Sequence, residues 1–171
     1  MKRIFLLIFF SNFTLSELIL EITQGTEDPF RVAIIQFEGS NDIANDVHQI
    51  IKNNLKRSGE FTIFDNDDLL SIPKSESDII FNDFKILNID YLVIGNITND
   101  NLNITSEYKV FDINKSTKVR SSTIFGIPNK NRQLAHYISD GIYEEITGIK
   151  GIASTKISVS YTHLRAHETE S

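Results

Sequence analysis

The chain has 171 residues, of which 40% are hydrophobic and 23% charged. This is the composition of one ordinary globular domain, and it excludes a disordered polymer or a polytopic membrane protein. With 17 basic and 23 acidic residues (net charge −6) the chain has no basic surplus for a nucleic-acid backbone, and without cysteine it has no disulfide, thiolate metal site or lipidated N-terminal cysteine.

Residues 1–16 have the pattern of a secretory signal peptide. Lys2 and Arg3 precede the apolar run 4–10, and a tolerable but imperfect cleavage site follows at residues 14–16. The apolar run is too short to cross about 30 Å of hydrocarbon. We therefore expect the signal to be removed and the mature chain not to insert into a membrane. An exported chain without cysteine favours the bacterial periplasm.

Residues 17–28 are predicted to form an N-terminal arm. Polar and apolar residues roughly alternate over residues 17–23, which favours extended backbone. Two interpretations remain open from the residues alone: an edge strand of the domain that follows, or a segment that adds to the sheet of a partner protein. The candidate partner-binding residues are Glu17, Leu18, Ile19, Leu20, Glu21, Ile22 and Thr23.

Residues 29–151 are predicted to form an α/β domain that begins with a strand–helix–strand unit. The apolar run 31–37 indicates a strand buried on both faces. An amphipathic helix begins at Ser40 or Asn41 and ends near Arg57, before Gly59. The next strand covers residues 61–64, so a right-handed crossover is expected.

The second half of the domain adds two helices and three strands. A short helix ends before Asn88, a buried strand covers residues 90–97, and a hairpin joins strands within 102–110 and 119–125. The last helix follows Pro128 and ends at Gly148. Together the elements predict a three-layer domain: a mixed sheet of about five strands with helices on both faces.

Catalytic and metal-binding patterns are weak in this domain. His48 and His136 fall on the polar sides of their predicted helices and are expected at the surface. The acidic run 65–68 lacks the glycine and glutamate of a calcium loop, and it is expected to cap a short turn at residues 68–70. No phosphate-binding glycine loop or esterase motif is present. The sequence therefore predicts no enzyme, metal or cofactor.

The end of the chain differs in composition from the rest. His163 and His167 are four residues apart and beside Glu168, so a small metal-dependent enzyme was one alternative. The segment resembles a translated sequencing-adapter tail, however, and residues 159–171 are predicted to be non-native. Residues 152–158 look like the first strand of a further domain.

Three stretches, residues 31–37, 87–97 and 135–151, resemble the N-terminal domain of the TolB family, which belongs to the Tol-Pal system of Gram-negative bacteria. The third stretch is the most specific and is similar to the family signature H-x-x-S-D-x-[VI]-[FY]-E-x-[LI]-T-G-[IE]-K-G. The matching signature residues, expected to be structural, include Asp140, Glu144, Thr147, Gly148, Ile149, Lys150 and Gly151.

The resemblance implies a TolB N-terminal (anticodon-binding-domain-like) fold. It also implies a non-enzymatic periplasmic adaptor that serves outer-membrane integrity and cell division. In the family the arm contacts the inner-membrane protein TolA, and a six-bladed β-propeller after this domain binds the lipoprotein Pal. The resemblance thus implies a chain truncated before the propeller, without the Pal site. The alternative is an exported CsgG-like assembly or binding module with the same core.

Overall fold

The computed structural model describes residues 28–39, 41–100 and 102–155. The predicted signal peptide, the arm up to residue 27, and the tail with His163 and His167 therefore lie outside the described residues.

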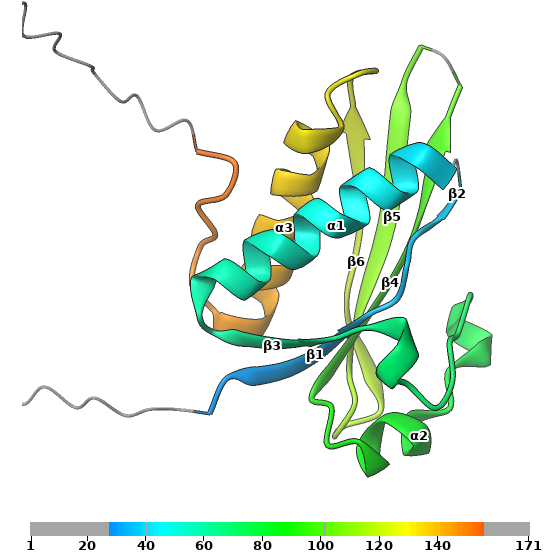
Figure 1. Ribbon diagram of the computed structural model, residues 1–171, viewed down its shortest axis with the longest axis vertical. Helices are drawn as coiled ribbons and strands as arrows, with labels where there is room; N and C mark the ends of the chain where they lie inside the picture. Colours follow the sequence, from blue (N-terminus) through cyan, green and yellow to red (C-terminus); the bar gives the residue numbers. More distant parts are fainter. Residues whose placement is uncertain (1–27, 40, 101, 156–171) are drawn as a thin grey trace, which may run out of the picture.

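The predicted mixed sheet with helices on both faces is confirmed (Figure 1). In chain order the main elements are β1 (Phe30–Ile34), β2 (Glu38–Gly39), α1 (Asn41–Ser58), β3 (Phe61–Phe64), α2 (Phe81–Ile86), β4 (Tyr91–Asn99), β5 (Ile104–Asp112), β6 (Thr117–Gly126) and α3 (Asn131–Thr147). The strand order is β3-β1-β4-β5-β6, with β2 beside β4. Strands β3, β1 and β4 run parallel, whereas β4, β5 and β6 form an antiparallel meander.

The sheet has six strands where about five were expected, because the predicted strand 31–37 divides in two. β1 ends at Ile34, and the chain pairs with β4 again at the two-residue β2. Phe37 lies outside both strands yet is buried, and its ring packs where a side chain at Gly95 would otherwise lie. The apolar run therefore continues past the strand because its last residue still belongs to the core.

Two hydrophobic cores lie on opposite faces of the sheet. Along β1, Val32 and Ile34 belong to the larger core, and the alternate residues Ala33 and Ile35 belong to the smaller one. Since successive strand residues point to opposite faces, this division explains the unbroken apolar run. Phe84 of α2 fills the smaller core.

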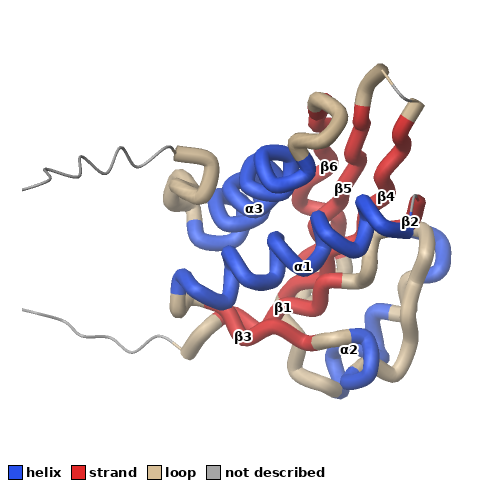
Figure 2. The backbone as a smooth tube through the Cα atoms, turned by 45° about the horizontal axis from the view of Figure 1, so that its top comes forward, coloured by secondary structure: helices blue, strands red, loops and turns tan. Residues whose placement is uncertain are grey.

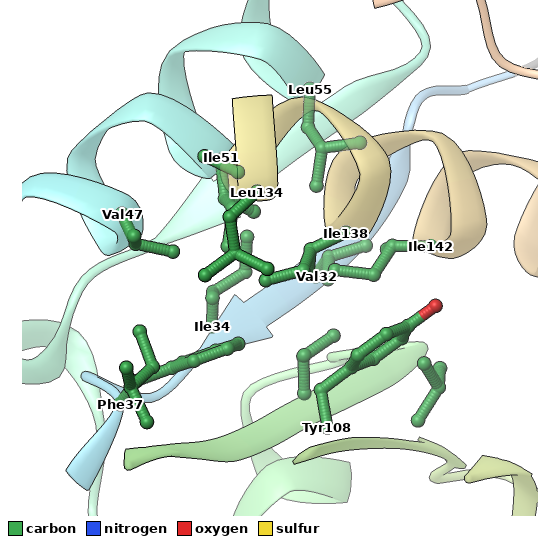
Figure 3. Packing of buried hydrophobic residues seen from close by; sticks show 14 of the residues in the cluster. Val32, Ile34, Phe37, Val47, Ile51, Leu55, Tyr108, Leu134, Ile138 and Ile142 are labelled. Carbon is green, nitrogen blue, oxygen red and sulfur yellow. The ribbon is translucent and has the colours of Figure 1, made fainter. Parts of the chain in front are cut away.

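Helices α1 and α3 lie side by side over the larger core (Figures 1 and 2). Figure 3 shows their apolar stripes meeting above the sheet. The side chains come from α1 (Val47, Ile51, Leu55), α3 (Leu134, Ile138, Ile142), β1 (Val32, Ile34) and β5 (Tyr108). The amphipathic pattern predicted for residues 41–57 thus corresponds to the side of α1 that packs into the larger core.

Glycine 141 allows α3 to approach β5 closely. A Cβ atom built at Gly141 would overlap the hydroxyl of Tyr108, which is buried beneath the helix. That hydroxyl accepts a hydrogen bond from Nε of Arg120 (3.1 Å), and Nη1 of Arg120 lies 3.3 Å from Oε2 of Glu145. A hydrogen bond and an ion pair therefore connect β5, β6 and α3 beside the contact between Gly141 and Tyr108.

The surface position predicted for His48 is wrong. The residue is only 5% exposed, because the buried stripe of α1 is wide enough to include it beside Val47. Burial lowers the pKa of His48 from 6.5 to about 4; the charge of Lys52 lowers it further and that of Asp65 opposes the shift. Its Nδ1 atom has no hydrogen-bond partner among the described residues. The histidine is therefore neutral and part of the core at neutral pH.

The acidic run 65–68 caps a turn, as expected, but one turn earlier in the chain. Asp65 precedes a short 3₁₀ helix at Asn66–Asp68, and Asp68 accepts a hydrogen bond from the Asp65 backbone N–H at 3.3 Å. Asp65 also pairs with Lys52 of α1. The run is therefore held by a hydrogen bond within the turn and by an ion pair with α1.

We expect Gly141→Ala to destabilise the fold by about 1–3 kcal/mol through overpacking against Tyr108, despite the higher helix propensity of alanine. Tyr108→Phe removes the overlapping hydroxyl and should rescue part of this loss in the double variant. Urea unfolding of the two single variants and the double variant measures the coupling. Strict additivity would contradict the proposed contact.

We expect His48 to make the fold less stable as the pH falls from 7 to 5. The unfolded chain binds a proton below pH 6.5, whereas the folded chain does not until about pH 4, so protonation favours unfolding in this window. The loss attributable to His48 at pH 5 is about 1–2 kcal/mol. His48→Leu should flatten the dependence by that amount in denaturant unfolding; parallel curves for the two proteins would show that burial does not shift this group.

Candidate functional site

The predicted signature residues gather at the end of α3 and in the turn that follows it. Gly148 adopts the left-handed conformation (φ 72°) and donates its N–H to the carbonyl of Glu144 at 2.9 Å. The hydroxyl of Thr147 donates to the carbonyl of Tyr143 at 2.8 Å and accepts from the N–H of Ile149 at 3.1 Å. These residues therefore end the helix and turn the chain back, as the C-terminal pattern predicted.

Asp140 holds the returning chain against α3. Its Oδ1 accepts the backbone N–H of Ala153 at 2.6 Å, and its Oδ2 accepts that of Ser154 at 2.8 Å. Gly151 is buried against the same residue, and a Cβ atom there would lie 2.5 Å from the Asp140 Cα. Glycine is thus required by close approach. We call residues 151–155, held in this way, the latched segment.

The latched segment overlaps the first residues of the predicted strand 152–158. Within it the N–H of Thr155 donates to the carbonyl of Ile152 at 3.0 Å, so the chain forms a turn here. Residues 156–158 lie outside the described part of the chain, and the strand stays a prediction. The side chains of Glu144, Ile149 and Lys150 are exposed, and the structure gives them no part in the latch.

A cleft of about 670 Å³ lies between α1, α3 and the latched segment. Its polar lining centres on Asn54 of α1, whose Nδ2 lies 2.9 Å from Nδ1 of His136 and 3.0 Å from Oγ of Ser139. The Ser139 hydroxyl donates in turn to the carbonyl of Ala135 at 2.7 Å. Asn54 therefore links the two helices across the cleft.

His136 lies at the surface, as expected, but it is half-buried in the lining of this cleft. Burial lowers its pKa, and the positive charges of Arg132 and Arg57 lower it further, while Asp140 opposes them. Histidine therefore stays neutral at neutral pH, and its Nδ1 can accept the hydrogen bond from Asn54.

The cleft has a basic rim and an aliphatic wall. Arg57, Arg132 and Lys150 line it, and Ile149 and Ile152 are 62% and 75% exposed. The Ser139 hydroxyl donates to its own helix, and Nδ1 of His136 lies within hydrogen-bond distance of Asn54. The lining thus combines positive charge at its rim with an exposed aliphatic surface.

Within residues 28–39, 41–100 and 102–155, no group of three or more His, Asp or Glu side chains could hold a metal ion. No helix in the same described ranges combines the length and apolar character needed to cross a membrane.

Comparison with known proteins gives one consistent family. A family model described as the TolB amino-terminal domain matches residues 18–119. The Tol-Pal system protein TolB of Alcanivorax borkumensis is 36% identical over 151 residues, covering 88% of this chain and 35% of the relative. The TolB of Pseudomonas aeruginosa is 32% identical over 140 residues, covering 81% of this chain and 32% of the relative.

A solved structure agrees with these relatives. The crystal structure of TolB from Acinetobacter baumannii superposes with a TM-score of 0.66 at 26% identity, covering 75% of this chain and 31% of that one. The chain thus spans about a third of the length of the curated relatives it matches.

We expect Asp140→Ala to destabilise the fold by about 1–3 kcal/mol, because two backbone N–H groups lose a charged acceptor. Asp140→Asn keeps one acceptor oxygen and should cost less. Hydrogen exchange should show that the amides of Ala153 and Ser154 lose protection in both variants, while those of β4 and β5 keep theirs when compared at equal global stability. Unchanged protection at residues 153 and 154 would contradict the latch.

Proposed function

Because the chain belongs to the TolB amino-terminal domain family, we propose that it acts in the Tol-Pal system as a non-enzymatic periplasmic adaptor that supports outer-membrane integrity and cell division. The observation that carries this proposal is the family match over residues 18–119, together with relatives that are all named Tol-Pal system protein TolB.

The proposed contact with a TolA-like inner-membrane protein is the N-terminal arm. The family match begins at residue 18 and so includes most of the arm. In the described chain, the N–H of Phe30 donates to the carbonyl of Glu60 at 2.9 Å, which fixes the first residue of β1 in the sheet. The arm therefore precedes a firmly anchored strand.

Strand addition is the binding mode that the arm sequence suits best. If extended, the arm places Leu18, Leu20 and Ile22 on one face and both glutamates on the other. Main-chain hydrogen bonds to a sheet edge supply affinity, and alternate apolar side chains supply specificity. Ordering such a segment costs about 2–5 kcal/mol, which favours reversible binding.

Binding of a Pal-like lipoprotein belongs, in this proposal, to the β-propeller of the family and not to the domain described above. In this proposal, the domain described above contributes to that binding only by fixing the start of the chain segment that follows α3. The Asp140 latch supports this, since it fixes the last described residues against α3.

We expect the variant Leu18→Asp with Ile22→Asp to bind the C-terminal domain of the cognate TolA at least about tenfold more weakly, because two apolar contacts are replaced by charges. The matched control is Ile19→Asp with Thr23→Asp, which adds the same charge to the opposite strand face and should lose less affinity. Isothermal titration calorimetry measures both. Unchanged affinity in the first variant would refute the assignment of the arm.

A further inference from the structure

The cleft between α1, α3 and the latched segment carries an unbalanced positive charge. Its rim holds Arg57, Arg132 and Lys150, and none of the three forms an ion pair within residues 28–39, 41–100 and 102–155. The chain as a whole has a net charge of −6. Three cations that form no ion pair in the described residues surround one cleft of an acidic protein. This charge is suited to binding an anionic group of another molecule.

The carboxylate in the lining does not neutralise these cations. Both oxygens of Asp140 accept backbone N–H groups from the latched segment, and within residues 28–39, 41–100 and 102–155 this carboxylate forms no ion pair with the three cations. The guanidinium of Arg57 is held at the end of α1 by the Asn53 carbonyl (3.3 Å) and Oδ1 of Asn54 (3.4 Å), both neutral groups. The positive rim is thus partly preorganised.

The wall of the cleft is aliphatic. Ile149 and Ile152 are among the most exposed large hydrophobic side chains of the described chain, and Leu55 and Tyr143 continue the apolar surface inward. Exposed aliphatic groups beside a cleft of this size are typical of a binding site for a group that is itself partly apolar.

From this combination we propose that the cleft docks a segment of a partner protein that is both acidic and aliphatic. The three cations come from three separate places, the end of α1, the start of α3 and the turn after α3, so they match carboxylates spaced along a peptide. The proposal concerns residues other than the arm and does not depend on the Tol-Pal role.

Calorimetric titration of the full chain with synthetic peptides tests this. The probe is a hexapeptide of alternating Glu and Leu, capped at both ends, and the controls are the matching Gln–Leu and Lys–Leu peptides. We expect binding of the Glu–Leu peptide that weakens as salt rises, and at least about fivefold weaker binding of the Gln–Leu peptide, because the rim contacts are ionic.

A matched pair of variants locates the site. Arg57→Gln with Arg132→Gln should weaken binding of the Glu–Leu peptide at least about fivefold. The control is Lys56→Gln with Lys130→Gln, which removes the same charge from the neighbouring positions outside the cleft and should change the affinity less than about twofold. Both variants should unfold at the same temperature.

Three results would overturn the proposal: no binding of the Glu–Leu peptide at about 1 mM, equal loss in the two variants, or equal affinity for the Glu–Leu and Gln–Leu peptides. Binding to vesicles of anionic phospholipid in place of the peptide would also overturn it and would assign the cleft to a lipid surface. Loss of TolA binding by the arm variant is a separate result, since that variant leaves the cleft intact.

Discussion

The fold depends on burial of the sheet's central strands on both faces. β1 lies between β3 and β4, and its alternate residues enter two different cores. The buried residues of β1 (Val32, Ala33 and Ile34) are all apolar, and the charged Arg31 near its start is only partly buried. The chain must therefore supply a covering layer on each face of the sheet. Helices α1 and α3 cover one face, and the much smaller α2 with its flanking loops covers part of the other.

The unequal helical layers on the two faces of the sheet explain where the cleft lies. On the larger face, close packing at Gly141 brings α3 down onto Tyr108. The end of α3 is then near the end of α1, and the chain that returns from α3 completes the cleft beside Asn54. On the smaller face, Glu76 pairs with Lys109 at 2.9 Å and Lys118 at 3.0 Å, which ties the loop before α2 to the hairpin. Ionic contacts thus supplement a thin apolar layer there.

The family signature acquires a physical meaning from this geometry. Gly148 and Thr147 end the helix, Asp140 receives the returning backbone, and Gly151 permits its close approach. The resemblance implies that these residues are structural, and the hydrogen bonds show how they end α3 and attach the returning chain to it. Glu144, Ile149 and Lys150 are exposed, and the proposed docking of an acidic segment gives Ile149 and Lys150 a role that the latch does not.

The sequence by itself determined the elements, because strand alternation, helical periodicity and the glycine after α3 are set by neighbours within a few residues. Only the tertiary structure decided which side chains meet. Asp140 finds its donors 13 and 14 residues away, and Asn54 contacts Ser139 across 85. Helix α1 packs against α3 and β3, and the side chains that it buries include His48, which no local pattern could report. Such contacts depend on the distance between whole elements, and that distance is fixed only when both cores are packed.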